Sequence, residues 1–395
     1  MALNIFWFLP TAGGDGRYLG KSSSGRRSTN AYLRQIATTA ELLGYDGLLV
    51  PTGSGNLDPI VTAASLATAT SRIKLLVALR HTATGGPTVF ARQTATLDEA
   101  LNGRLLYNIV PGAWPDDRLR EGVSLNHDER YESADEFFTI WKRLMLGENV
   151  TFKGKYYQVE NAENLYWGVQ KPYPPLFFGG SSNAAHDFAA KHVDTYLSWG
   201  EPPSMAAEKI ADVKKRAAAL GRSVRFGFRL QVIVRESEKE AWEAAGRLIS
   251  RLDDETIETA QARQRSSDSI GQKRISDLHN GDRSKLEVSP NLWAGVGLVR
   301  SGAGTALVGS PEIVAERIKE YVAIGADTFV FSGYPHLEES IRFAELVFPL
   351  LKRESIFESD QVVTGGGFEV GQRFVIAGRE SKTDGKTSRS KQSAA

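Results

Sequence analysis

The sequence predicts an α/β fold, a parallel (β/α)8 barrel with inserted segments. Eight short apolar runs end in small or polar residues, and most are separated by stretches with apolar residues at helical spacing. This alternation over 395 residues is typical of a closed barrel. An open doubly wound sheet is the alternative, but after the first run the chain reads PTAGGDGRYLG (10–20) and lacks that fold's usual phosphate-binding fingerprint.

The predicted strands and helices follow one another along the chain. The strands are the apolar runs 4–10, 47–52, 74–80, 105–110, 176–181, 195–199, 225–234 and 328–334. The first helix predicted between them, 32–43, places Ile36, Ala40 and Leu43 on one face. Residues with the same periodicity predict further helices over 134–146, 184–191 and 311–324.

The run 225–234 is the most informative of the predicted strands. Its even positions are all apolar, whereas its odd positions include Arg229 and Gln231. Because successive side chains of a strand face opposite sides, the apolar face is expected to pack on helices, with Arg229 and Gln231 inside the barrel. An unpaired guanidinium would be costly there. Arg229 therefore either forms an internal salt bridge or binds an anionic ligand.

Two segments depart from the strand and helix rhythm. Residues from about 250 to 300 contain polar stretches and predict a mobile lid, although a helical excursion that builds a subunit interface is the alternative. Residues 378–395 hold five Lys or Arg, two Asp or Glu and almost no apolar residue. We therefore expect one barrel domain over 1–360 and a polar C-terminal extension over 361–395, disordered alone or ordered against a partner subunit.

The composition excludes several classes of protein. With 48 Lys and Arg against 47 Asp and Glu, there is no basic excess of the kind that nucleic-acid binding needs. No run is long enough to span a membrane and the start lacks the basic region of a signal peptide, so we expect a cytoplasmic protein. The absence of cysteine excludes disulfides, Cys-ligated metals and thiol nucleophiles. The chemistry must use other groups or a borrowed cofactor.

The residues at the predicted strand ends are rich in cations, amides and aromatic rings. Because active sites of such barrels lie at these ends, these residues form the candidate site. Glu201 is the only carboxylate directly at a strand end, which disfavours a glycosidase that needs two. The six histidines show no metal-ligand spacing, so no metal site is predicted.

A glycine and serine cluster, Gly179-Gly180-Ser181-Ser182, lies between a predicted strand and a helix. Its backbone permits close approach, its hydroxyls can donate, and a helix start favours anions, so it is a candidate phosphate site. Gly-Gly turns also occur for steric reasons alone. Two weaker motifs, GKS (20–22) and GSG (53–55), lack the glycine spacing of a nucleotide-binding loop.

Eight sequence blocks resemble the alkanesulfonate monooxygenases of the bacterial-luciferase-like flavin family. They are NIFWFLPT (4–11), ATLDEALNGRLLYNIVPG (95–112), QKPYPPLFFGGSS (170–182), YLSWGEPP (196–203), RFGFRLQVIVRE (225–236), RLISRLDDETI (247–257), SPNLWAGVGLVRSGAGTALVG (289–309) and FSGYPHLEE (331–339). The resemblance runs from about residue 3 to 352 and implies a TIM (β/α)8 barrel.

The resemblance implies a two-component, desulfonating monooxygenase. Reduced FMN (FMNH2) would come from a separate NAD(P)H-dependent flavin reductase, and O2 and an organosulfonate would yield sulfite and an aldehyde. A homodimer or homotetramer is implied. By matched position, Arg229 and Arg300 serve the sulfonate and oxygen chemistry, and Trp199, Tyr334 and His336 hold the sulfonate oxygens. The positions matched to FMN contacts are Asn108, Tyr131, Gly180, Ser181 and Ser182.

Three departures from the family pattern suggest the substrate. Where simple alkanesulfonate enzymes of the family have His, His and Cys, this chain has Ala12, Gln231 and Asn56. Amides hydrogen-bond hydroxyl groups in both directions, so we hypothesise a polyhydroxylated sulfonate, as in the sulfoquinovose monooxygenases, whose product is 6-oxo-glucose. The alternatives are a linear alkanesulfonate monooxygenase, a related oxidoreductase acting on aldehydes or sulfones, and a non-catalytic flavin- or sulfonate-binding protein.

Overall fold

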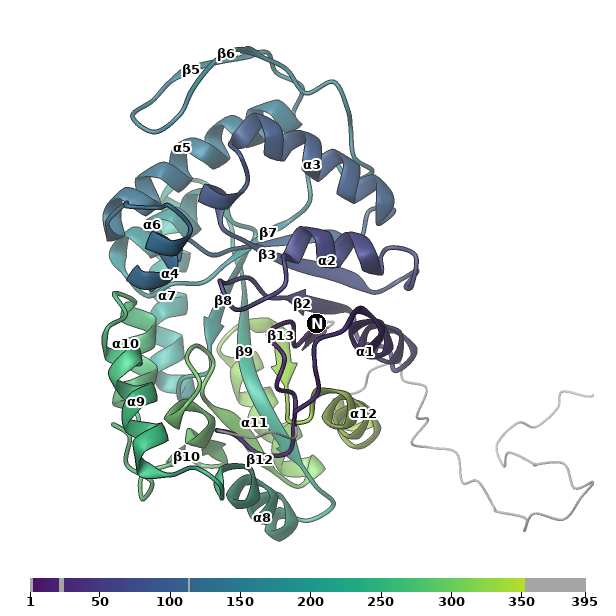
Figure 1. Cartoon of the computed structure of the whole chain (residues 1–395), viewed down its shortest axis with the longest axis vertical. Coiled ribbons are helices and arrows are strands. Elements are labelled where there is room, and N and C mark those ends of the chain that lie inside the picture. The colour runs from purple at the N-terminus through teal and green to yellow at the C-terminus, as the bar shows by residue number, and fades with distance from the viewer. Residues whose placement is uncertain (1–2, 21–24, 113, 352–395) are drawn as a thin grey trace, which may run out of the picture. The chain divides into compact units, whose positions relative to one another are not determined.

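The computed structural model describes residues 3–20, 25–112 and 114–351. Among these residues eight parallel strands close into a barrel, which confirms the predicted fold class (Figure 1). The extension predicted for 361–395 lies outside the described residues. Around the barrel the strands are β1 (Asn4–Phe8), β2 (Gly47–Val50), β3 (Lys74–Leu79), β4 (Leu105–Ile109), β7 (Leu176–Phe178), β8 (Thr195–Trp199), β9 (Arg225–Val234) and β13 (Ala326–Ser332), the last pairing with β1.

Alternate strand residues fill the interior of the barrel. One buried cluster joins Phe6, Phe8, Leu49, Leu76, Ala78, Leu106, Phe177, Leu197 and Val330. In the β9–β13 register Arg229 stands opposite Val330. On the other face of β9, the Phe228 ring lies 4.7 Å from that of Tyr321 in α11 (Pro311–Ala323). The strand thus places its apolar face against a helix and Arg229 on the inner side, as its alternation predicts.

Helices connect and cover the strands. The other helices of the repeating units are α1 (Asn30–Leu42), α2 (Pro59–Leu66), α3 (Pro87–Ala100), α5 (His127–Met145), α6 (Asn183–His192), α7 (Pro203–Ala219), α8 (Glu238–Ile249) and α12 (His336–Val347). Helix α5 begins seven residues before the predicted start at 134, because Asn126 and Glu129 form a capping box that the apolar periodicity does not reveal.

Some elements had no sequence expectation. The hairpin of β5 (Val150–Lys153) and β6 (Gln158–Ala162) forms a separate two-stranded sheet. Short helix α4 (Pro115–Arg120) follows β4, and strand β12 (Ala306–Gly309) pairs in parallel with the last residues of β9. Each is four to six residues long, too short for periodicity to distinguish it from a loop.

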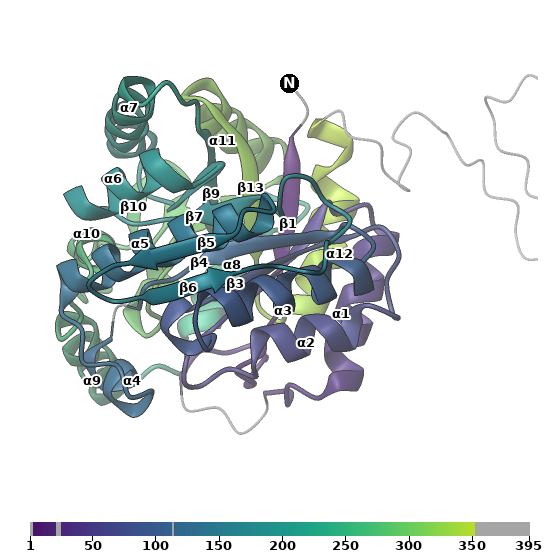
Figure 2. The same ribbon diagram turned by 90° about the horizontal axis from the view of Figure 1, so that it is seen from above.

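The insertion predicted over about 250–300 is largely helical. It contains α9 (Asp254–Arg265), α10 (Ile270–Asp277), β10 (Glu287–Ser289) and β11 (Leu292–Trp293). The end of α9 lies near α4, since a guanidinium nitrogen of Arg263 in α9 is 3.9 Å from an oxygen of Asp117 in α4, and the view from above shows the two helices next to each other (Figure 2). Its mobility as a lid stays a prediction. Across the described part of the chain, none of the helices has the length and apolar character to cross a membrane.

Candidate functional site

A cavity of about 670 Å³ opens where the barrel strands end. Residues at the ends of β2, β3, β4, β7 and β8 line it, together with Arg229 from the middle of β9 and residues of the insertion. This is the position expected for the active site of a barrel enzyme. Eight of the predicted site residues line the cavity: Asn56, Asn108, Tyr131, Gly180, Ser181, Ser182, Trp199 and Arg229.

The segment Gly180–Ser182 joins β7 to α6. The Ser182 hydroxyl caps α6 by accepting from the Ala185 N–H at 3.1 Å, and Lys209 of α7 donates to the Ser181 hydroxyl at 3.3 Å. A Cβ on Gly180 would lie 2.6 Å from that of Ala185, so packing requires glycine there. Hydroxyls, a helix N-terminus and a lysine therefore converge on one wall of the cavity.

The single strand-end carboxylate, Glu201, is bound by two cations. It is fully buried, accepts from Lys209 at 2.8 Å and from Arg274 of α10 at 2.9 and 2.7 Å. Burial raises the pKa of Glu201, but hydrogen bonds from Arg274 and the charge of Lys209 outweigh it and lower the pKa overall. Glu201 is therefore an ionised anchor that ties the insertion to the barrel, not a general acid. Sequence reasoning found neither Lys209 nor Arg274, because helical lysines and arginines carry no local signal of such a role.

Two arginines meet at the Phe8 ring. The guanidinium carbon of Arg229 lies 4.4 Å from the centre of the Phe8 ring, and that of Arg300 lies 5.2 Å from it. Arg300 also donates to the Tyr334 hydroxyl. Burial and the charge of Arg300 lower the pKa of Arg229. Among the residues described, neither arginine has a carboxylate within salt-bridge distance, so together they form a positive site suited to an anion.

His336 lies against the same Phe8 ring, 5.5 Å away between centres. Its Nδ1 is 2.8 Å from an oxygen of Asp15, which also accepts from the His336 backbone N–H at 3.0 Å. The His336 Nε2 is buried without a hydrogen-bond partner. Desolvation lowers the pKa of His336. The hydrogen bond and charge of Asp15 oppose this shift, but the charges of Arg300 and Arg229 add to it, and the pKa is lowered overall. Asp15, which follows β1 in the TAGGDG segment, orients this histidine and was not singled out from the sequence.

Asn56 and Gln231, the two amide residues that depart from the family pattern, occupy different places. Asn56 lines the cavity and accepts from the Thr11 hydroxyl at 3.0 Å. Gln231 is buried in the barrel wall, where it accepts from the Ser332 hydroxyl at 2.7 Å and donates to the Ala303 carbonyl at 3.3 Å. Gln231, Arg300, Tyr334 and His336 are the predicted site residues that do not line the cavity itself.

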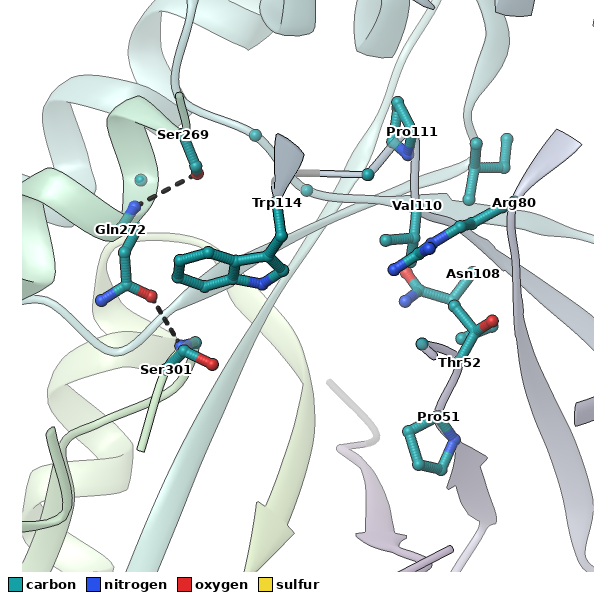
Figure 3. Close-up of a pocket in the computed structure, with 18 of the residues that line it drawn as sticks. Pro51, Thr52, Arg80, Asn108, Val110, Pro111, Trp114, Ser269, Gln272 and Ser301 are labelled. Atoms are coloured by element: carbon teal, nitrogen blue, oxygen red, sulfur yellow. Dashed lines mark hydrogen bonds between the residues drawn. The ribbon is translucent and has the colours of Figure 1, made fainter. Parts of the chain in front are cut away.

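Trp114 stands across the mouth of the cavity. Figure 3 shows its indole between insertion residues Gln272 and Ser301 on one side and Arg80 and Asn108 on the other. Arg80 is buried and pairs with Glu121. The insertion and the β3 and β4 ends thus face each other across one aromatic side chain, as a flat ligand would require.

Comparison with known proteins gives consistent matches over nearly the whole chain. The family model described as luciferase-like monooxygenase matches residues 3–328. A structure of riboflavin lyase with modified FMN and riboflavin is 22% identical and has a TM-score of 0.75, covering 89% of this chain and 91% of that one. Long-chain alkane monooxygenase is 21% identical (TM-score 0.74, covering 90% and 94%), and the EDTA monooxygenase of Chelativorans sp. BNC1 is 20% identical (0.70, 89% and 94%). At these identities the structural likenesses show the fold.

Proposed function

Because the chain belongs to the luciferase-like monooxygenase family, we propose that it is a two-component flavin-dependent monooxygenase that cleaves the C–S bond of an organosulfonate. A separate NAD(P)H-dependent flavin reductase would supply reduced FMN. The proposal includes a homodimer or homotetramer, which the sequence resemblance implies. It also includes a cytoplasmic location and closure of the insertion as a lid, which the sequence itself predicts.

The residues of the cavity fit FMN. The hydroxyls of Ser181 and Ser182, the start of α6 and the ammonium of Lys209 suit the phosphate. Trp114 and Trp199 offer aromatic faces to the flavin ring, and Asn108 and Tyr131 offer hydrogen-bonding groups. Bound reduced FMN supplies the two electrons that activate O2. The protein's part is to position the reactants, exclude water and stabilise charge.

The main support for a sulfonate substrate comes from two arginines that have no carboxylate partner among the described residues. Arg229 and Arg300 bring two positive charges to the Phe8 ring without a carboxylate partner in the described residues. An anion that binds there satisfies both guanidiniums. As the C–S bond breaks, sulfite leaves, one oxygen atom of O2 becomes the aldehyde oxygen and the other becomes water.

The favoured substrate is sulfoquinovose, with 6-oxo-glucose as the product. Asn56 and Ala12 both line the cavity, and the Asn56 amide could hydrogen-bond a hydroxylated chain that extends from the anion site. The Gln231 amide already bonds within the protein, so hydroxyl recognition is assigned to Asn56.

Sulfite release tests the proposal. The protein is incubated with FMN, a flavin reductase, NADH and air, and with sulfoquinovose, octanesulfonate or methanesulfonate in parallel. We expect sulfite from sulfoquinovose above the others. A preference for octanesulfonate would indicate a linear alkanesulfonate enzyme. Absence of sulfite from all three would refute the desulfonating function, and absence of O2 consumption beyond that of free reduced FMN would indicate a binding protein.

A further inference from the structure

Asp268, in the turn between α9 and α10, binds two arginines from the other side of the cavity. Its oxygens lie 3.1 Å from the Arg130 guanidinium of α5, and one lies 3.0 Å from that of Arg118 in α4. The Arg130 side chain is only 2% exposed. Within the described part of the chain, its other hydrogen bond goes to the Leu125 carbonyl, at 3.4 Å. A buried guanidinium is costly without an anion, so Asp268 satisfies a charge that would otherwise be unpaired.

The Asp268 carboxylate stands beside the proposed phosphate site. Asp268, Arg130, Tyr131 and Ser182 all line the same cavity. The Tyr131 hydroxyl is hydrogen-bonded to Ser182. It also lies close enough to Arg130 and Asp268 for the charges of both to shift its pKa. The Asp268 side chain is 30% exposed, whereas Arg130 behind it is covered. A phosphate entering from the cavity therefore meets the carboxylate before it meets the guanidinium.

From this arrangement we propose that Asp268 is an internal substitute for the flavin phosphate on Arg130, and that the phosphate displaces it. The inference rests on the proposed function, since it takes the ligand to be FMN. A phosphate monoester carries about −1.5 to −2 charges at neutral pH and would repel the carboxylate at close range. Displacement removes this repulsion and leaves Arg130 paired with the phosphate.

The exchange would connect cofactor binding to the insertion. Asp268 is the residue through which the turn 266–269 holds α4 and α5. Its release frees this turn, while Arg274 of α10 keeps its bonds to Glu201. The insertion is thus expected to loosen at one anchor and stay fixed at the other when FMN binds. Riboflavin, which lacks the phosphate, leaves both anchors in place.

The affinities for FMN and riboflavin test the exchange, because the two ligands differ only in the phosphate. We expect Asp268→Asn to bind FMN about tenfold more tightly than the wild type, equivalent to about 1.4 kcal/mol, with riboflavin affinity unchanged. Asp277→Asn is the matched control, since it removes an equal charge from an exposed position of α10, the helix that follows this turn. Weaker or unchanged FMN binding by Asp268→Asn would show that the carboxylate does not compete with the phosphate.

Hydrogen exchange of the wild type gives a second measurement that does not depend on a variant's stability. FMN should increase amide exchange in residues 266–269, whereas riboflavin should not. Protection of these amides by FMN, or no difference between the two flavins, would overturn the proposed displacement. If neither flavin binds, the proposed function fails and the exchange with it; if FMN binds normally without these effects, only the exchange fails.

Discussion

The two parts of the site, the α6 wall of the cavity and the cluster around Phe8, which we call the Phe8 wall, differ in how their cations are paired. On the α6 wall, Lys209 is paired with Glu201 and Arg130 with Asp268. A phosphate that binds there contacts hydroxyls, the start of a helix and cations whose charge a carboxylate already neutralises. Around Phe8, Arg229 and Arg300 have no carboxylate partner among the described residues. The first wall is stable without ligand, whereas the second holds positive charge that only a ligand neutralises. Under the proposed function, this difference is the reason to expect the cofactor phosphate at the first wall and the reacting anion at the second.

The largest expected effect is the loss of turnover in Arg229→Ala. Removing one charge-assisted anion contact should lower kcat/KM for sulfite release about hundredfold, because hydrogen bonds to charged groups are worth about 1.5–3 kcal/mol. FMN affinity, measured by flavin fluorescence, should stay within about twofold, since the proposed phosphate site lies at the start of α6. Arg247→Ala, on the exposed face of α8, is the control. Equal losses of FMN binding and turnover would contradict the division between the walls.

The second prediction concerns the stability of the paired wall. Glu201→Gln should lower the free energy of unfolding by about 2 kcal/mol, because Lys209 and Arg274 lose their shared anion. The exposed Glu208→Gln on the same helix as Lys209 should change it little. Urea unfolding of both variants measures the difference. A stable Glu201→Gln protein would mean that the two cations are satisfied elsewhere.

The same carboxylate gives a dependence on pH. The folded-state pKa of Glu201 lies below its ordinary value of 4.5, so its contribution is present above about pH 4.5 and is lost as pH falls through the lower folded value. Wild-type stability should therefore decline more steeply below pH 4.5 than that of Glu201→Gln. Parallel acid-unfolding curves for the two proteins would rule out this contribution.

A smaller effect is expected from Ser182→Ala at the phosphate site. Loss of one hydroxyl donor should weaken FMN binding about fivefold while leaving riboflavin affinity unchanged, consistent with about 1 kcal/mol for a hydrogen bond. The variant also loses a helix cap. Ser310→Ala removes the corresponding cap of α11 and serves as the control for this loss. A similar change in FMN affinity in both variants would attribute the effect to stability.

The smallest effect sharpens the choice of substrate. Asn56→Ala should raise the KM for sulfoquinovose about threefold, the equivalent of a weak hydrogen bond, and leave octanesulfonate turnover unchanged. Steady-state kinetics with both substrates measure the difference. If both KM values rise equally, Asn56 contributes to the shape of the cavity but does not hydrogen-bond a hydroxyl group of the substrate.

Periodicity and strand ends predicted the main features of the barrel. The run 225–234 became β9 over the same residues, with Arg229 on the inner side, because burial of an apolar face against helices leaves no other orientation. By contrast, β12 and α4 are too short to produce a pattern. The capping box at Asn126, a local signal, would have placed the start of α5 correctly.

The sequence by itself determined the barrel, the segment Gly180–Ser182 and the presence of cations at the strand ends, because these depend on local periodicity and residue type. The tertiary structure decided which cations are paired. Glu201 and Asp268 reach their partners across the insertion, 73 residues from Glu201 to Arg274 and 138 from Arg130 to Asp268. Such distant pairs leave no trace in local sequence, since a charge is neutralised by whatever the fold brings within a few ångströms.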